Sequence, residues 1–211
     1  VEINDFGMHF AFTPTFVDAD GNYDPDGDVI GKVEQDGEWD EFTPRVVLDW
    51  AVTDEVMLYA SWAEGYNSGG FNSASDRNDD PAYDPANVEN LEFGIKSTWL
   101  DNTLRINAAW FQYDFENLQA LELIPAACLP GSSFATNLFE TSDVEGEGIE
   151  LAINWAPLAG LELWGNLGTL DAEYSDRVRR REVDGVCDPI DETGEKFAGS
   201  PELSYALGAS Y

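Results

Sequence analysis

The sequence predicts an all-β protein, an antiparallel β-barrel meander that crosses a membrane, and three observations lead to that prediction. Apolar and polar residues alternate over long segments, short connections take turns with long ones, and a tryptophan precedes each short connection. A period of two places successive side chains on opposite faces of a strand. We therefore expect strands with one apolar face toward lipid and one polar face toward a wet lumen.

A hairpin at 87–119 shows the alternation most clearly. Its first arm contains LEFGIKSTW and its second begins LRINAAW, and in both arms every second residue is mostly apolar. Between the arms, Asp101-Asn102 is a tight-turn dipeptide. Each arm has about ten residues or more, which is long for a soluble sheet but suits a tilted path across a bilayer.

Eight strands are predicted from this alternation, including the two arms of the hairpin. In chain order they cover 1–12, 42–52, 56–66, 87–99, 104–119, 143–155, 161–174 and 201–211. The short connections are 53–55, 100–103 and 156–160, and the long ones are 13–41, 67–86, 121–142 and 175–199. A meander with this order collects the short turns at one rim and the long loops at the other, as outer-membrane barrels do.

Three tryptophans support the membrane prediction. Trp50, Trp99 and Trp155 stand just before the three short connections. Tryptophan is enriched at membrane–water interfaces, where barrels carry an aromatic girdle. A soluble β-sandwich gives no reason for this placement.

Composition narrows the function classes. The net charge of −32 and the pI near 4.1 disfavour nucleic acid as a partner, because phosphate binding needs lysine and arginine. Aromatic residues at 13% and hydrophobic residues at 43% distinguish the chain from an acidic disordered tail. The chain opens VEINDFGMHF, without the basic start and apolar core of a signal peptide. We therefore expect that a leader has been removed or that the chain is a fragment.

The sequence gives little support to catalysis, and we predict that the protein is not an enzyme. Its single histidine, His9, lies in the first predicted strand with no nucleophile patterned beside it. CxxC, HExxH and P-loop motifs do not occur.

Six stretches in series resemble the β-barrel of TonB-dependent outer-membrane receptors. They are FTPRVVLDW (42–50), LYASWAEGYNSGGFN (58–72), DPANVENLEFGIKS (84–97), LRINAAWFQYDFENLQ (104–119), GEGIELAINWAPLAGLEL (146–163) and SPELSYALGASY (200–211). The resemblance implies that residues 1–211 are part of a larger barrel domain of the 22-stranded type. The plug domain of the family has no counterpart in the sequence, so the resemblance implies an internal piece of a receptor.

The same resemblance implies a function. Receptors of this family lie in the outer membrane of Gram-negative bacteria, bind a scarce small-molecule cargo at extracellular loops and import it with energy from TonB. Siderophores or other iron chelates, cobalamin and saccharides are the cargo types. The expected partners are outer-membrane lipid and lipopolysaccharide, the cargo, and the TonB complex through the missing plug region.

An alternative from a different class is a complete eight-stranded outer-membrane barrel with a structural or adhesive role. Such a barrel must fill its centre with side chains. The inward residues of the last predicted strands are small or charged, which favours the wall of a wider barrel.

The long loops carry the candidate ligand-binding residues. The segment GYNSGGFN offers aromatic and amide groups, although turn formation explains its glycines equally well. The segment RVRRR offers forked donors for phosphate or carboxylate, although pairing with nearby acidic residues is the interpretation that we favour. The residues concerned are Tyr66, Asn67, Phe71, Asn72, Arg177, Arg179, Arg180 and Arg181.

Further candidates lie in the lumen, in an acidic loop and at the cysteines. Charged residues expected on the lumen face are Arg45, Asp49, Glu92, Lys96, Arg105 and Glu150. They can contact cargo or a plug, but we favour a hydrated cross-strand network. The acidic loop 18–28 is a candidate site for a divalent cation, the one cofactor that we consider. Its expected ligands are Asp20, Asp24, Asp26 and Asp28. The spacing does not match an EF-hand, so a solvated acidic loop is favoured.

The two cysteines, Cys128 and Cys187, fall in two different predicted loops. In an oxidising compartment they are expected to pair with each other, with free or oligomer-linking thiols as the alternative.

Overall fold

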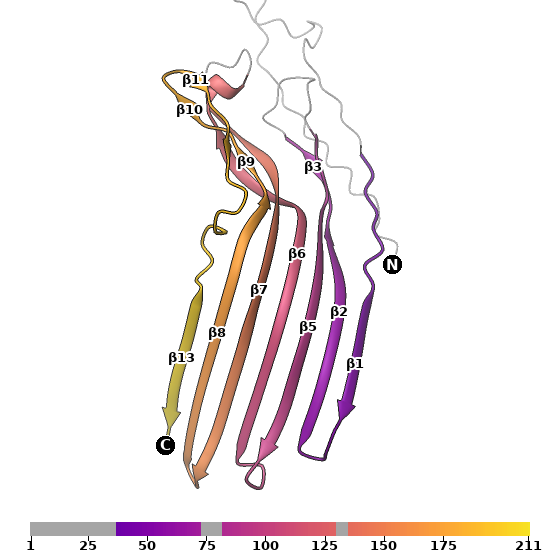
Figure 1. Ribbon diagram of the computed structural model, residues 1–211, viewed down its shortest axis with the longest axis vertical. Coiled ribbons are helices and arrows are strands. Elements are labelled where there is room, and N and C mark those ends of the chain that lie inside the picture. The colour runs from indigo at the N-terminus through magenta and orange to yellow at the C-terminus, as the bar shows by residue number, and fades with distance from the viewer. Residues whose placement is uncertain (1–36, 73–81, 130–134) are drawn as a thin grey trace, which may run out of the picture.

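The computed structural model describes residues 37–72, 82–129 and 135–211, and shows them as a tall antiparallel wall (Figure 1). Seven long strands form one sheet in the order β1-β2-β5-β6-β7-β8-β13. Their bounds are β1 Arg45–Ala51, β2 Val56–Asn67, β5 Ala86–Trp99, β6 Leu104–Ile124, β7 Thr136–Leu158, β8 Leu161–Asp176 and β13 Leu203–Ser210. The predicted antiparallel meander is confirmed, and among the described residues the sheet stays open, with β1 and β13 at its two edges. The predicted strand at 1–12, with His9, lies outside the described residues.

Short elements occupy the longer connections. They are β3 Gly70–Phe71, β4 Ala82–Tyr83, the 3₁₀ turn η1 Ala126–Cys128, β9 Val178–Arg179, β10 Glu182–Val183, β11 Val186–Cys187 and β12 Ile190–Asp191. Figure 1 places the tight turns at the lower end of the wall and these longer excursions at its upper end. Within the described part of the chain, no helix is long and apolar enough to cross a membrane.

The predicted loop at 121–142 is wrong in its bounds. β6 continues to Ile124 and β7 begins at Thr136, so the connection is 125–135. The cause is a bulge: the pairing of β6 with β7 shifts between Phe115 and Leu118, and Asn117 has a positive φ of 56°. An extra residue in one strand shifts the phase of alternation without ending the strand. The alternation of apolar and polar residues therefore breaks at Asn117, although the pairing of β6 with β7 continues to Ile124.

Register places the two kinds of side chain on opposite faces of the wall. Asp49 lies opposite Tyr59, Tyr59 opposite Gly94, Gly94 opposite Ala109, and Ala109 opposite Glu150. Directly opposed residues share a face, so these five define the polar face. By alternation along each strand, the charged residues expected in the lumen all lie on this face.

The other face is apolar, and no other described part of the chain covers it. One of its rows runs Trp50, Leu58, Ile95, Ala108, Leu151, Leu167 and Tyr205. Large side chains on this face remain exposed, for example Leu48 at 69% and Leu207 at 78%. On β6 the apolar residues begin at Leu104 and give way to polar ones at Gln112, about 26 Å along the strand at ~3.3 Å per residue. This height suits the apolar band of a membrane barrel, about 25 Å tall.

Glycines on the polar face receive aromatic rings from the neighbouring strand. Tyr113 lies opposite Gly146, and Phe111 lies opposite Gly148. A Cβ on Gly148 would lie 2.6 Å from the Phe111 ring and 2.1 Å from the backbone carbonyl oxygen of Thr169. Aromatic side chains that cover strand glycines in this way help to fix register.

We predict that Gly148→Ala destabilises the wall by about 1–3 kcal/mol, because the added methyl group meets backbone that cannot move aside. Gly168→Ala is the matched control on the same face, since its Cβ would meet the rotatable Ser204 hydroxyl at 2.9 Å. Denaturant titration of both variants gives the comparison. Equal free energies of unfolding for the two variants would contradict this packing.

Directly beyond the apolar face, on the same side of the sheet, five carboxylates stand in one row across five strands. They are Glu64, Glu89, Asp114, Glu145 and Glu173. Like charges directly opposite each other in a sheet are destabilising. On β7 and β8 the acidic surface begins one row earlier, with Glu147 and Asp171.

We predict that Asp114→Asn raises the free energy of unfolding by about 0.2–1 kcal/mol, because it removes the central charge of this row. The gain shrinks as salt is added, since Asp114 is exposed to solvent. Asp188→Asn is the control, because Asp188 pairs with Arg181 and its neutralisation brings no such relief. Denaturant titrations at low and high ionic strength measure both effects. A loss of stability in Asp114→Asn would count against the repulsion.

Candidate functional site

The β6–β7 hairpin extends beyond the rest of the wall, and two long loops contact its end. Residues 118–124 of β6 pair with residues 136–142 of β7, and we call this part the β6–β7 extension. Glu122 lies opposite Leu138 on one of its faces, and Leu121 lies opposite Phe139 on the other. Each face holds a different loop.

The loop between β2 and β5 is fastened to the face that carries Phe139. Asn72 Nδ2 donates to the Phe139 carbonyl oxygen at 3.2 Å, and the Phe139 N–H donates to Asn72 Oδ1 at 2.7 Å. The Tyr83 ring lies 4.8 Å from the Phe139 ring. Gln119 Nε2 donates to the carbonyl oxygens of Ser68 and Asp84 at 3.0 and 2.9 Å. Two side-chain amides therefore attach this loop to β6 and β7: Asn72 of the loop bonds the backbone of β7, and Gln119 of β6 bonds the backbone of the loop.

These contacts place the candidate residues of GYNSGGFN. Asn72 bonds the main chain of β7, and Asn67 Nδ2 donates to Gln119 Oε1 at 2.8 Å. The Phe71 ring lies 5.5 Å from the Trp39 ring. The Tyr66 hydroxyl is buried and has no hydrogen-bond partner among the described residues. The structure therefore brings Asn67, Phe71 and Asn72 together as parts of one packed loop.

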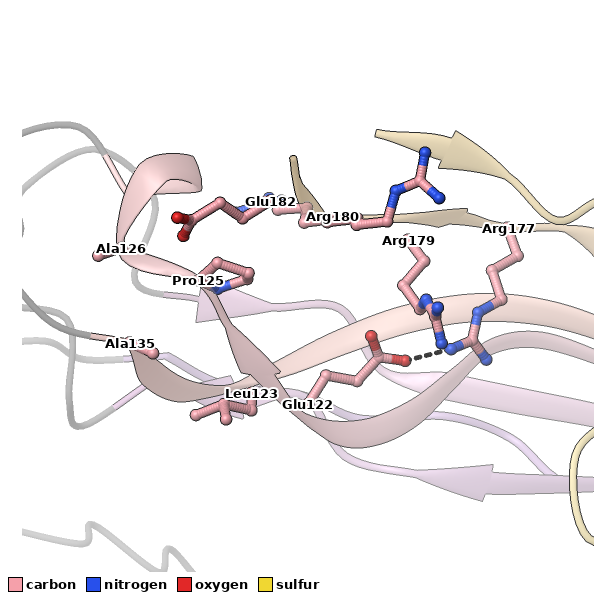
Figure 2. A pocket seen from close by; sticks show the side chains of 10 residues that line it. Glu122, Leu123, Pro125, Ala126, Ala135, Arg177, Arg179, Arg180 and Glu182 are labelled. Carbon is pink, nitrogen blue, oxygen red and sulfur yellow. Dashed lines mark hydrogen bonds and ion pairs between the residues drawn. The ribbon is translucent and has the colours of Figure 1, made fainter. Parts of the chain in front are cut away.

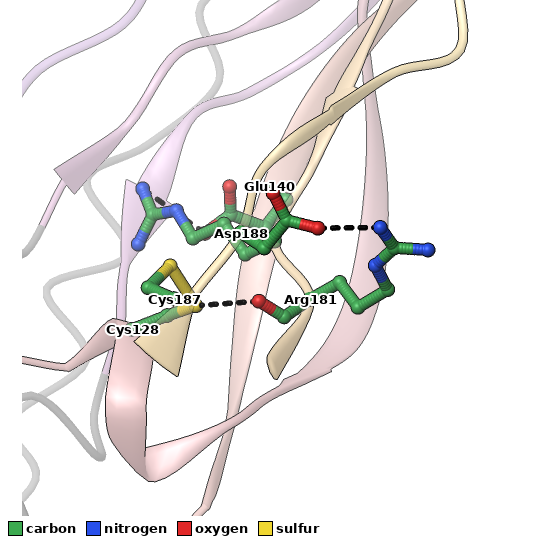
Figure 3. Close-up of a disulfide and its surroundings, with 6 residues drawn as sticks. Cys128, Glu140, Arg181, Cys187 and Asp188 are labelled. Carbon is green, nitrogen blue, oxygen red and sulfur yellow. Dashed lines mark hydrogen bonds and ion pairs between the residues drawn. A yellow bond between two sulfur atoms is a disulfide. The ribbon is translucent and has the colours of Figure 1, made fainter. Parts of the chain in front are cut away.

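The loop between β8 and β13 is fastened to the opposite face. A disulfide joins Cys128 of η1 to Cys187 of β11, with the Cα atoms 4.7 Å apart (Figure 3). Ile124, Cys128 and Leu138 form a buried apolar cluster, with Cys187 packed against it. The disulfide therefore links two loops over a small core of their own.

Arg177 is the most enclosed of the four candidate arginines. Its guanidinium lies 2.5 Å from Glu122 and 3.0 Å from Glu192, and its side chain is 13% exposed. The same group lies 4.2 Å from the centre of the Tyr174 ring. Arg177 therefore ties the β8–β13 loop to the β6–β7 extension.

The other three arginines are about half exposed and each has an acidic neighbour. Arg179 lies 3.0 Å from Glu192 and Arg180 lies 3.6 Å from Glu140, while Arg181 pairs with Asp188. Burial raises the pKa of Glu140, Arg180 lowers it and Glu122 raises it further. A guanidinium has five N–H donors, so such pairs leave donors for other acceptors.

An open pocket of about 740 Å³ lies among these arginines (Figure 2). One part of its lining is apolar, from Leu123, Pro125, Ala126 and Ala135. The rest is charged, from Glu122, Glu182 and the four arginines. Such a lining can hold a ligand that has both an apolar body and acidic groups.

On the polar face of the wall, charged residues bond to neighbours across strands. The Tyr59 hydroxyl donates to Glu92, and the Lys96 ammonium lies 4.9 Å from the centre of the Tyr59 ring. The predicted divalent-cation ligands in loop 18–28 lie outside the described residues. Within the described ranges, no group of three or more acidic, histidine or cysteine side chains is arranged to hold a metal ion.

Sequence reasoning missed Gln119, Glu122, Tyr83 and Glu192. The first two lie beyond the bulge that breaks the alternation: Gln119 is the last residue of the predicted strand 104–119, and Glu122 falls in the predicted loop 121–142. Glu192 is one acid among 42 in the chain, so composition hides it. A usable signal is the run LQALELI at 118–124, in which Gln119 and Glu122 are the two polar residues of a mostly apolar segment.

Comparisons with known proteins agree with this architecture. The family model described as "TonB dependent receptor-like, beta-barrel" matches residues 12–211. The ferripyoverdine receptor of Pseudomonas aeruginosa matches with a TM-score of 0.58 and 20% identity, over 82% of this chain and 21% of that one. The ferric yersiniabactin uptake receptor of Yersinia pestis matches with a TM-score of 0.56 and 17% identity, over 78% and 22%.

A third solved structure has the same fold. The ferric preacinetobactin receptor of Acinetobacter baumannii matches with a TM-score of 0.53 and 22% identity, over 79% of this chain and 22% of that one. At these identities the likeness establishes the fold. The chain spans about a fifth of the length of these three receptors.

Proposed function

Because the chain belongs to the TonB-dependent receptor-like β-barrel family, we propose that it is part of an outer-membrane receptor that imports a scarce small molecule with energy from TonB. The observation that carries the proposal is the uncovered apolar face below a fastened group of long loops. Such a wall suits lipid on one side, and such loops suit capture of a cargo from outside the cell. Members of this family are Gram-negative outer-membrane proteins, and the proposed location follows from that.

A metal chelate is the proposed cargo, in preference to cobalamin or a saccharide. Three solved proteins with this fold are named as receptors for ferripyoverdine, ferric yersiniabactin and ferric preacinetobactin. The pocket beside the β6–β7 extension offers guanidinium donors and an apolar surface, which suit an organic chelate with acidic groups. We propose Arg179, Arg180 and Arg181 as its contacts, with lipopolysaccharide phosphates as the competing ligand.

The alternative of a closed eight-stranded barrel gains no support from the polar face of β13. Its residues there are Ser204, Ala206, Gly208 and Ser210. A closed barrel of that size fills its interior with side chains, and these are among the smallest available. Small residues suit a wide lumen instead.

Uptake by intact cells tests the proposal. Cells that express the whole receptor are given ⁵⁵Fe-labelled ferripyoverdine, ferric yersiniabactin, ferric preacinetobactin and ferric citrate, with labelled cobalamin and maltose for the other cargo types. We expect energy-dependent uptake of a ferric chelate that disappears in cells without TonB. Uptake that is unchanged without TonB would overturn active transport, and uptake of cobalamin or maltose alone would overturn the chelate.

A further inference from the structure

Arginine is concentrated in one short segment outside the wall. The segment RVRRR at 177–181 holds four of the chain's ten basic residues. Arg45, Lys96 and Arg105 instead lie in β1, β5 and β6, on the polar face of the wall. The segment follows the end of β8 and therefore lies at the rim that carries the long loops. It offers consecutive arginines to the space outside the membrane.

The arginines of this segment differ in how firmly they are held. Arg177 has two carboxylate partners and is mostly enclosed. Arg179 belongs to β9 and pairs with Ile190 of β12. Arg180 and Arg181 lie between β9 and β10, and the Arg181 carbonyl oxygen accepts a hydrogen bond from the Asp188 N–H at 2.7 Å. The Arg180 side chain is 43% exposed, and its ion pair with Glu140 is 3.6 Å long.

The Arg180–Arg181 bond lies between two short β-ladders. The β9–β12 and β10–β11 ladders have two residue pairs each. Ladders of this length open locally at low cost, and exposed loop segments of this kind are where proteases cut. An endoprotease that cleaves after arginine must bind that arginine's side chain. It must also bind the backbone on both sides of the bond in an extended conformation. Arg180 meets the first need and its position between two short ladders meets the second.

A disulfide spans the same bond. Cys128 precedes the bond and Cys187 follows it, so the two chain segments produced by a cut at this point remain joined through sulfur. In addition, β13 pairs with β8 along its full length, from Leu203 opposite Thr169 to Ser210 opposite Glu162. The segment after a cut therefore keeps both a covalent and a hydrogen-bonded attachment to the wall.

We propose that the Arg180–Arg181 peptide bond is a cleavage site for an endoprotease that cleaves after arginine, and that the Cys128–Cys187 disulfide retains the cut receptor as one molecule. The reaction adds one water across the amide: Arg180 gains a carboxylate and Arg181 gains an ammonium group. The cut lies in the charged part of the pocket lining, between Arg179 and Glu182. Cleavage therefore loosens that part of the pocket and leaves the wall intact.

Limited trypsin digestion of the whole receptor on intact cells tests the proposal, because the outer membrane keeps trypsin from the other rim. We expect a first cut whose new N-terminus is Arg181, two segments on a reducing gel and one band without reductant. Arg180→Gln removes the side chain that the protease binds and abolishes the N-terminus at Arg181. Arg181→Gln is the matched control, because it keeps Arg180 and preserves cleavage after it.

Folding of both variants is checked by the shift of the unheated band on a denaturing gel, a sign of an intact barrel. A first cut elsewhere, an N-terminus at position 181 that persists in Arg180→Gln, or separation of the segments without reductant would each overturn the proposal. The Cys128→Ala/Cys187→Ala variant is expected to release the segments without reductant. None of these outcomes depends on which cargo the receptor carries.

Discussion

An arginine at Ala108 is expected to destabilise the wall by about 2–4 kcal/mol, whereas an arginine at Ala109 is expected to be nearly neutral. The two alanines are neighbours on β6 but lie on opposite faces. Ala108 is aligned with Ile95 and Leu151, near the middle of the apolar face. A charge there must enter hydrocarbon or distort the membrane, and its cost is greatest at the midplane.

Ala109 is the matched control because the residue type and the position along the strand are almost the same. It is aligned with Gly94 and Glu150 on the polar face. The Tyr59 ring covers Gly94, and an arginine at position 109 lies beside Glu150, so water and this carboxylate solvate its charge. Guanidinium titration of the whole receptor in phospholipid vesicles, followed by tryptophan fluorescence, measures both variants. Similar costs at the two positions would contradict the assignment of faces.

Removal of the disulfide through Cys128→Ala/Cys187→Ala is expected to lower the opening free energy of the loops by about 2–4 kcal/mol. The bond closes a sequence separation of 59 residues, so the open state gains much conformational freedom when it is lost. Alanine at both positions keeps the small core of Ile124 and Leu138 without a lone buried thiol. The strands of the wall below the β6–β7 extension lie outside this core and are expected to keep their stability.

Hydrogen exchange measured by mass spectrometry separates the two regions. Faster exchange is expected at 122–124, 136–140 and 177–191, with no change along 104–112 of β6. Arg181→Gln is the control, because its exposed pair with Asp188 contributes far less. Unchanged exchange in the loops of the double variant would contradict a stabilising role of the disulfide.

The wall could be predicted from the sequence because period-two alternation is a local property. Ala108 and Leu151 follow the pattern of their own strands, and pairing adds nothing to their assignment. The β6–β7 extension could not be predicted, because the bulge at Asn117 shifts the phase, and the predicted loop at 121–142 covers at least one partner of each of its seven residue pairs. Beyond the bulge, β6 and β7 pair again. The alternation within one strand does not encode this pairing.

The candidate site was predictable as a set of residues but not as an arrangement. The RVRRR segment is visible as a cluster of charge, yet its partners Glu122, Glu140 and Glu192 come from distant parts of an acidic chain. Likewise, Asn72 was expected in a turn, and its two bonds to Phe139 depend on where β7 passes. Tertiary contacts of this kind have no period and leave no local signature.

Nitroxide labels placed singly at positions 105–110 of β6 in the membrane-embedded receptor test the central claim most directly. Spin-label accessibility to oxygen reports contact with lipid, and accessibility to a water-soluble nickel chelate reports contact with water. We predict oxygen maxima at 106, 108 and 110, alternating with low values at 105, 107 and 109. Oxygen accessibility without a period of two, or with its maxima at the odd positions, would contradict a wall that turns its apolar face to lipid.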